Sequence, residues 1–196
     1  MPAVVLLDQR GSRNRGDLVG PFTEELGTAR GLRFLLPFER TAGDEMQALL
    51  DDPKTLGEVV LTALQSEWWW VGIGLGDVAK PVPTSVREGR GNAFLLARQA
   101  IAAAKRARLR VRVLGQHVDA SDFEAALHLM GVLFAGRRAT AQQAVRLRRQ
   151  GLTQREISAS LGITVQAVSA RLRTAHWVEE EAGRRLVQRL AEPLLS

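Results

Sequence analysis

The first 115 residues alternate between short apolar runs and stretches in which apolar residues recur every three or four positions. The runs predict strands at 3–7, 32–39, 46–50, 68–76 and 109–114. The recurring pattern predicts helices at 17–28, 53–66 and 93–107, the first of them capped by Asp17. The segment 40–45 joins the second and third strands as a hairpin. The resulting order, β-α-β-β-α-β-α-β, indicates an α+β domain.

The fourth predicted strand has an unusual pattern, because alternation places Gly72, Gly74 and Gly76 on one face and bulky apolar side chains on the other. A face without side chains allows either a helix or a ligand to approach the backbone closely. Packing of a helix is the simpler of these two interpretations.

From residue 117 onward the pattern is helical throughout. A stripe of Phe123, Leu127, Met130 and Phe134 predicts a linker helix that opens with a capping box beginning at Ser121. Its apolar side can be buried against the first domain, against the last helices or against a second subunit. We therefore predict a first domain at 1–116, a linker helix at 117–138 and an all-α domain at 139–196.

The predicted all-α domain contains two short helices joined by a turn. Thr153 and Glu156 have the spacing of a capping box, Gly162 suits a turn with positive φ, and Thr164 can open the next helix. A similar box is predicted at Thr140 and Gln143. In the second of the two helices Val168 and Leu172 face inward, which leaves its polar residues outside. Such a pair of helices is typical of proteins that bind DNA in the major groove.

Charge strengthens this interpretation. The net charge of the chain is +6, and the segment 137–173 holds eight arginines against one acid, Glu156, a local net charge of about +7. The sequence has no cysteine, which excludes disulfides, thiolate catalysis and zinc-finger chemistry. The apolar run at the N-terminus is too short for a secretion signal or a membrane span, so we expect a cytoplasmic protein with no membrane partner.

The stretch GLTQREISASLGITVQAVSARLR resembles the sigma-region-4-like helix-turn-helix of bacterial transcriptional regulators. The resemblance implies that the helix after Thr164 enters the major groove of double-stranded DNA. We expect the protein to bind DNA as a homodimer, because helix-turn-helix proteins commonly read paired half-sites. We expect base contacts from Gln166, Ser169 and Ala170, and contacts to phosphate or guanine from Arg171 and Arg173. The full predicted DNA-binding set is Arg155, Thr164, Gln166, Ser169, Ala170, Arg171 and Arg173.

Four stretches of the first domain, VVLLDQRGSR, TAGDEMQALL, VGIGLGDV and GNAFLLARQAIAAAKR, resemble the ferredoxin-like palm of class III nucleotide cyclases and diguanylate cyclases, and most closely the SatD family. The resemblance implies that Asp8 and Asp44, assisted by Glu45, hold Mg²⁺ with a nucleotide. A hard cation relieves the repulsion between such carboxylates. Nucleotide phosphates would then meet the polar and basic residues Arg10, Ser12, Arg13 and Arg98.

Two departures separate this chain from active cyclases. Phe94 stands four residues before Arg98, where the cyclase helix usually carries asparagine, and the hairpin begins with Ala42-Gly43 where diguanylate cyclases have Gly-Gly. We therefore assign no catalytic residue. The leading hypothesis is a transcriptional regulator whose palm binds a nucleotide or related phosphorylated signal. The alternatives are a DNA-binding protein whose palm serves only dimerisation, and an active cyclase or nucleotidyl transferase.

Overall fold

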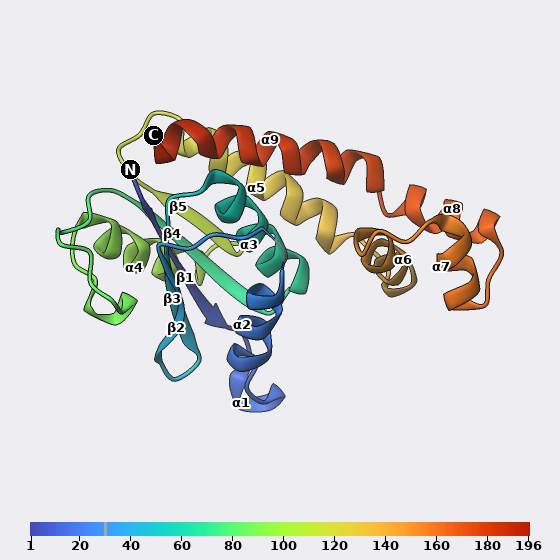
Figure 1. The fold of residues 1–196 in the computed structure, drawn as a ribbon, viewed down its shortest axis with the longest axis horizontal. Helices are drawn as coiled ribbons and strands as arrows, with labels where there is room; N and C mark the ends of the chain where they lie inside the picture. The colour runs from blue at the N-terminus through green and yellow to red at the C-terminus, as the bar shows by residue number, and fades with distance from the viewer. Residues whose placement is uncertain (30) are drawn as a thin grey trace.

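The computed structural model describes residues 1–29 and 31–196, except for the side chains of residues 13 and 15. The fold is α+β and is built on one mixed sheet of five strands in the order β2-β3-β1-β4-β5 (Figure 1). The strands are β1 Ala3–Gln9, β2 Leu36–Ala42, β3 Glu45–Leu50, β4 Trp69–Leu75 and β5 Val111–Leu114. The central strand β1 is antiparallel to β3 and β4, whereas β5 is parallel to β4.

Helices cover both faces of the sheet, so that β1 is buried along its whole length. Ala3, Val5 and Leu7 pack into the larger core, together with α2 Val19–Thr28, α3 Pro53–Ser66, α5 Ala120–Ala135 and α9 Trp177–Leu195. Val4 and Leu6 point to the opposite face, into a smaller core with α4 Asn92–Ala104. The predicted alternation of strands and helices is observed, with an additional short helix, α1 Ser12–Arg15, after β1.

The glycine face of β4 lies directly under α4. A Cβ atom on Gly74 would lie 2.1 Å from the carbonyl oxygen of Ala93, and one on Gly72 would lie 2.5 Å from the backbone nitrogen of Ile101. Of the two interpretations of the glycine strip, helix packing is therefore the one observed. Helix and strand backbones approach as closely as the missing side chains allow.

Helices α5 and α9 run side by side along the sheet (Figure 1). The α5 stripe, which includes Phe123 and Met130, is buried in the larger core of the same chain. The capping box predicted at Ser121 is wrong. The Glu124 carboxylate instead accepts a hydrogen bond from the backbone N–H of Val113 at 2.6 Å and forms an ion pair with Arg112. The carboxylate thus ties α5 to β5 rather than to its own first turn.

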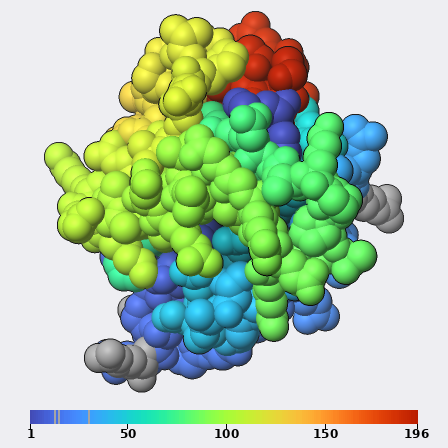
Figure 2. Space-filling model, turned by 90° about the vertical axis from the view of Figure 1, so that its left-hand side faces the viewer, coloured from blue at the N-terminus to red at the C-terminus, as the bar shows by residue number. Residues whose placement is uncertain are grey.

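Three short helices, α6 Ala139–Arg149, α7 Gln154–Leu161 and α8 Val165–Thr174, form a unit beyond the end of the sheet (Figure 1). This α6–α8 unit has its own small core, centred on Ile157, Val168 and Leu172. The last helix, α9, returns from this unit to the sheet. Near the end of α9, the carbonyl oxygen of Leu195 accepts a hydrogen bond from the amino group of Met1 at 2.7 Å. Figure 2 shows the two ends of the chain meeting on the surface.

Several predicted boundaries change. The second strand runs over Leu36–Ala42 instead of 32–39, because β2 is an edge strand that tolerates Pro37 and continues into polar residues. The hairpin turn shrinks to Gly43 and Asp44, since Ala42 already pairs with Glu45. The box predicted at Thr140 is wrong, because α6 begins at Ala139 without a side-chain cap. Among the described helices, none has the length and apolarity needed to cross a membrane.

Candidate functional sites

The starts of α7 and α8, and the turn between them, are fixed by residues that the sequence singled out. Thr153 Oγ1 accepts the backbone N–H of Glu156 at 3.3 Å, and the Glu156 carboxylate accepts the N–H of Thr153 at 2.7 Å, so the predicted capping box is confirmed. These bonds hold the pKa of Glu156 below its usual value. Gly162 ends α7 at φ 63°, and Thr164 caps α8 through the N–H of Ala167 at 3.1 Å.

Helix α8 presents one polar face to solvent. Val168 and Leu172 are buried, and the 3.6-residue period places Gln166, Ala170 and Arg173 on the opposite side. Ser169 and Arg173 also line a hollow of about 280 Å³ with Arg148 and Gln154. Arg171 lies at the edge of the buried side and is only partly exposed. Arg155 of α7 and Thr164, which caps α8, are exposed.

The arginines of segment 137–173 fall into two groups. Arg137, Arg148 and Arg149 donate to other groups of the chain. Within the described residues, the other five side chains have neither a hydrogen-bond acceptor nor an ion-pair partner: Arg138, Arg146, Arg155, Arg171 and Arg173. The first group stabilises the fold, and the second is available to an external polyanion.

A buried carboxylate joins the α6–α8 unit to the sheet-bearing part, which comprises the five strands with α1 to α5 and α9. Glu180 of α9 is fully buried and accepts from Arg137 at 2.7 Å, from Arg184 at 3.0 Å and from Arg149. Arg184 continues to Glu58 of α3 at 2.7 Å. Burial would raise the pKa of Glu180, but the three guanidinium groups together lower it below its usual value. This cluster thereby connects the ends of α5 and α6 with α9 and α3.

The sequence did not mark Glu180 as a functional residue, because it is the middle one of three consecutive acids. Its spacing of four residues from Arg184 is the local signal that could have marked it. The partners Arg137 and Arg149 reach it only through the folded chain.

The predicted acidic site lies at the end of β1. Asp8 is buried opposite Glu45 of β3, and Lys105, just after α4, donates to its carboxylate. Burial raises the pKa of Asp8, the ammonium of Lys105 opposes this shift, and the nearby carboxylates of Asp44 and Glu45 reinforce it. Glu45 also accepts from the hydroxyl of Thr41 at 2.7 Å.

This arrangement does not fit the expected Mg²⁺ site. The ammonium of Lys105 is paired with Oδ2 of Asp8, so this oxygen is not free for magnesium, which requires octahedral coordination by oxygen. Within the described part of the chain, no three acidic or histidine side chains converge as metal ligands. Positive charge at Asp8 is supplied by a side chain of the protein itself.

Among the described residues of the predicted phosphate-binding set, Ser12 and Arg98 lie in different hollows. Ser12 lines a hollow of about 540 Å³ beside the hairpin turn, with Asp17, Arg40 and Asp44. Arg98 lines a different cavity under α4, and Arg10 donates to the carbonyl of Glu67 at 2.8 Å and lies over the ring of Trp70. The side chain of Arg13 lies outside the described residues. The two hollows share no lining residue.

Comparison with models of known protein families, with curated proteins and with solved structures finds no match to this chain.

Proposed function

We propose that this protein is a DNA-binding transcriptional regulator, in which α8 reads duplex DNA and the sheet-bearing part binds a nucleotide or related phosphorylated ligand. The observation that carries the proposal is the polar face of α8, held by two capped helix starts and a glycine turn. A helix fixed in this way and exposed along one side suits insertion into the major groove.

The chemistry of that face supports the proposal. Gln166 can form two hydrogen bonds to adenine, Ala170 can contact a thymine methyl group, and Arg173 can pair with guanine or a phosphate. The guanidinium groups of Arg138, Arg146, Arg155 and Arg171 have no partner among the described residues and would contribute phosphate contacts that are not specific to sequence.

The Glu180 cluster supplies a physical route between the two parts. Its members come from α3, α9 and the ends of α5 and α6, so a shift of α3 against α9 changes the bonds that orient the α6–α8 unit. A ligand of the sheet-bearing part can alter DNA affinity only if it prefers one of two such arrangements.

We also propose that the protein binds DNA as a homodimer, because two-fold related helices read paired half-sites. The outer side of α5 supports this, since Leu129 and Val132 are 71% and 59% exposed. Both line a hollow of about 370 Å³ that extends to His176 at the start of α9. Analytical ultracentrifugation of Leu129→Asp should show monomer if this side forms the dimer.

Enrichment of genomic fragments by the purified full chain, followed by fluorescence anisotropy on the enriched duplex, tests DNA binding directly. Arg173→Ala should weaken binding by about tenfold and reduce the slope of log Kd against log salt by about 1. Gln166→Ala should mainly relax the sequence preference, because it removes a base contact.

Arg189→Ala is the matched control, since Arg189 is an exposed arginine of α9 far along the chain from α8. It makes the same change in net charge and should leave Kd within about twofold. Failure to enrich any duplex at low ionic strength, or equal weakening by both arginine substitutions, would refute the proposal.

A further inference from the structure

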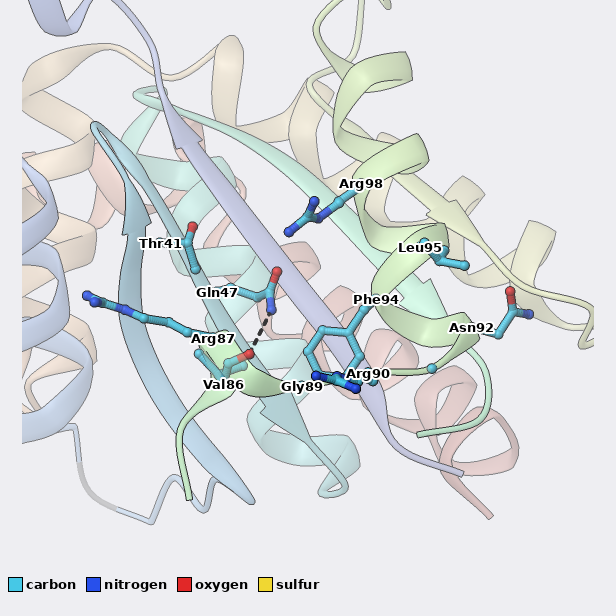
Figure 3. A pocket seen from close by; sticks show the side chains of 11 residues that line it. Thr41, Gln47, Val86, Arg87, Gly89, Arg90, Asn92, Phe94, Leu95 and Arg98 are labelled. Atoms are coloured by element: carbon cyan, nitrogen blue, oxygen red, sulfur yellow. Dashed lines mark hydrogen bonds between the residues drawn. The ribbon is translucent and has the colours of Figure 1, made fainter. Parts of the chain in front are cut away.

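A cavity of about 560 Å³ lies on the α4 face of the sheet, between the β2–β3 hairpin, the short helix η1 Val86–Glu88 and α4 (Figure 3). Its volume is in the range of small-molecule sites. We call it the α4-face cavity; its lining residues are Thr41, Gln47, Val86, Arg87, Gly89, Arg90, Gly91, Asn92, Phe94, Leu95 and Arg98.

The lining is strongly positive, with three arginines and no acidic residue among the described lining residues. Arg87 lies 3.7 Å from Glu39 and points across β2, away from the others (Figure 3). The guanidinium groups of Arg90 and Arg98 have no hydrogen-bond or ion-pair partner within the described chain. Figure 3 shows the guanidinium of Arg98 reaching from α4 over the strands towards Gln47 and Thr41. Two guanidinium groups are therefore available to an anion.

The cavity is also preformed. Phe94 packs so closely on the loop that a Cβ atom on Gly89 would lie 2.0 Å from its ring. Gly91 has φ +126°, and a Cβ atom there would lie 2.4 Å from the carbonyl oxygen of Asp77. The buried amide of Gln47 donates to the carbonyl of Val86 at 3.4 Å, which ties the floor to the loop. The same loop that carries Arg90 is thus held in place beside an aromatic ring.

We propose that the α4-face cavity binds a phosphate monoester carrying a flat ring, and binds it without a divalent metal. Arg90 and Arg98 neutralise the phosphate, because guanidinium groups match its oxygens in paired hydrogen bonds. Phe94 and Leu95 contact the ring, and Gln47, Thr41 and Asn92 offer hydrogen bonds to its polar edge. The inference rests on the proposed function, for which it supplies the place and chemical class of the ligand.

Charge explains why no metal is required. Among the described residues, the hairpin hollow has two acids, Asp17 and Asp44, and its arginine, Arg40, is already paired with Asp17, whereas the α4-face cavity presents cations without acids. The two hollows therefore make opposite predictions about Mg²⁺ and about the residues on which binding depends.

Isothermal titration calorimetry of the full chain, in EDTA and again with Mg²⁺, tests this difference, with adenosine and guanosine 5′-monophosphates, adenosine and inorganic phosphate as probes. At least one monophosphate should bind, more tightly than adenosine or inorganic phosphate. Arg98→Ala and Arg90→Ala should each weaken that binding by about tenfold or more, since each removes a charged hydrogen bond. Phe94→Leu should reduce the preference for the monophosphate over inorganic phosphate.

Arg108→Ala is the matched control, because Arg108 is exposed after α4 and does not line the cavity. Circular dichroism checks that each variant is folded. Binding that requires Mg²⁺ and is lost in Asp44→Ala but kept in Arg98→Ala overturns the inference while the nucleotide-binding part of the proposed function stands. Absence of binding by every probe, with DNA binding intact, overturns the inference and that ligand-binding part together. Inorganic phosphate that binds as tightly as a monophosphate also overturns the inference.

Discussion

Different forces stabilise the sheet-bearing part and the α6–α8 unit. Every residue of β1 is buried, and leucine, valine and aromatic side chains fill the cores on both sides of the sheet. The buried core of the α6–α8 unit has seven apolar residues, three of them the alanines Ala141, Ala144 and Ala175. So small a core supplies little hydrophobic free energy. The ion pairs at Glu180 join this unit to α9 and α3, and we expect its attachment to depend on them.

Among the substitutions proposed here, Glu180→Gln should cause the largest loss in the free energy of unfolding. The substitution keeps the shape of the side chain but leaves Arg137, Arg149 and Arg184 without their shared carboxylate. We expect a loss of about 3 to 5 kcal/mol in the free energy of unfolding, because breaking a buried ion pair leaves buried charge uncompensated. Urea denaturation measures the loss, and hydrogen exchange should show faster opening in α6 than in β1.

Glu179→Gln is the control for this experiment, because Glu179 is the exposed neighbour and makes none of the ion pairs seen within the described residues. It should leave unfolding within about 0.5 kcal/mol of the unaltered protein. If both variants lose the same free energy, the buried cluster does not attach the unit.

Gly74→Ala tests the packing of the sheet-bearing part. The new Cβ atom would meet backbone of α4 at 2.1 Å, so helix and strand must separate. We expect a loss of about 1 to 3 kcal/mol, as for other overpacked cores, with the opening confined to α4 and β4. Differential scanning calorimetry with hydrogen exchange measures this. Gly27→Ala, where a Cβ atom meets nothing within 4 Å, is the control and should not lower stability.

The same difference explains what the sequence could predict. Caps at Thr153 and Thr164 and the turn at Gly162 involve partners within four or five residues, so local patterns identify them. The glycine strip of β4 likewise favoured helix packing, which the structure shows. By contrast, the capping box at Ser121 failed because Glu124 has a stronger use at β5, where it meets a backbone N–H and Arg112.

Sites made by distant segments were predicted only in part. Arg98 was expected to meet phosphate, but Gln47, Arg87 and Arg90 come from a strand and a loop that the periodicity does not place beside α4. Asp8, Asp44 and Glu45 were correctly expected near one another. Their partner Lys105 was not, because it lies 97 residues from Asp8 along the chain. Long-range pairing of this kind is fixed by topology and leaves no local signal.

A smaller effect should follow from Thr153→Ala, which removes the hydroxyl that accepts the N–H of Glu156. We expect a loss of about 1 kcal/mol in the stability of the α6–α8 unit, the usual contribution of such a cap. DNA affinity should fall while monophosphate binding at the α4-face cavity stays unchanged. Thr153→Ser retains the cap and should restore both stability and DNA binding; if it does not, the hydroxyl has another role.

The smallest expected effect is on the pH dependence of unfolding. The pKa of Glu180 is lowered in the folded protein from its usual value of 4.5, so the folded state binds fewer protons than the unfolded state below that pH. Its stabilising contribution is complete above pH 4.5 and is lost as the pH falls through the lowered pKa. Urea titrations between neutral pH and about pH 3 should therefore show stability falling less steeply in Glu180→Gln than in Glu179→Gln. Equal slopes in the two variants would mean that the three arginines do not hold Glu180 ionised, and that the α6–α8 unit is attached by packing alone.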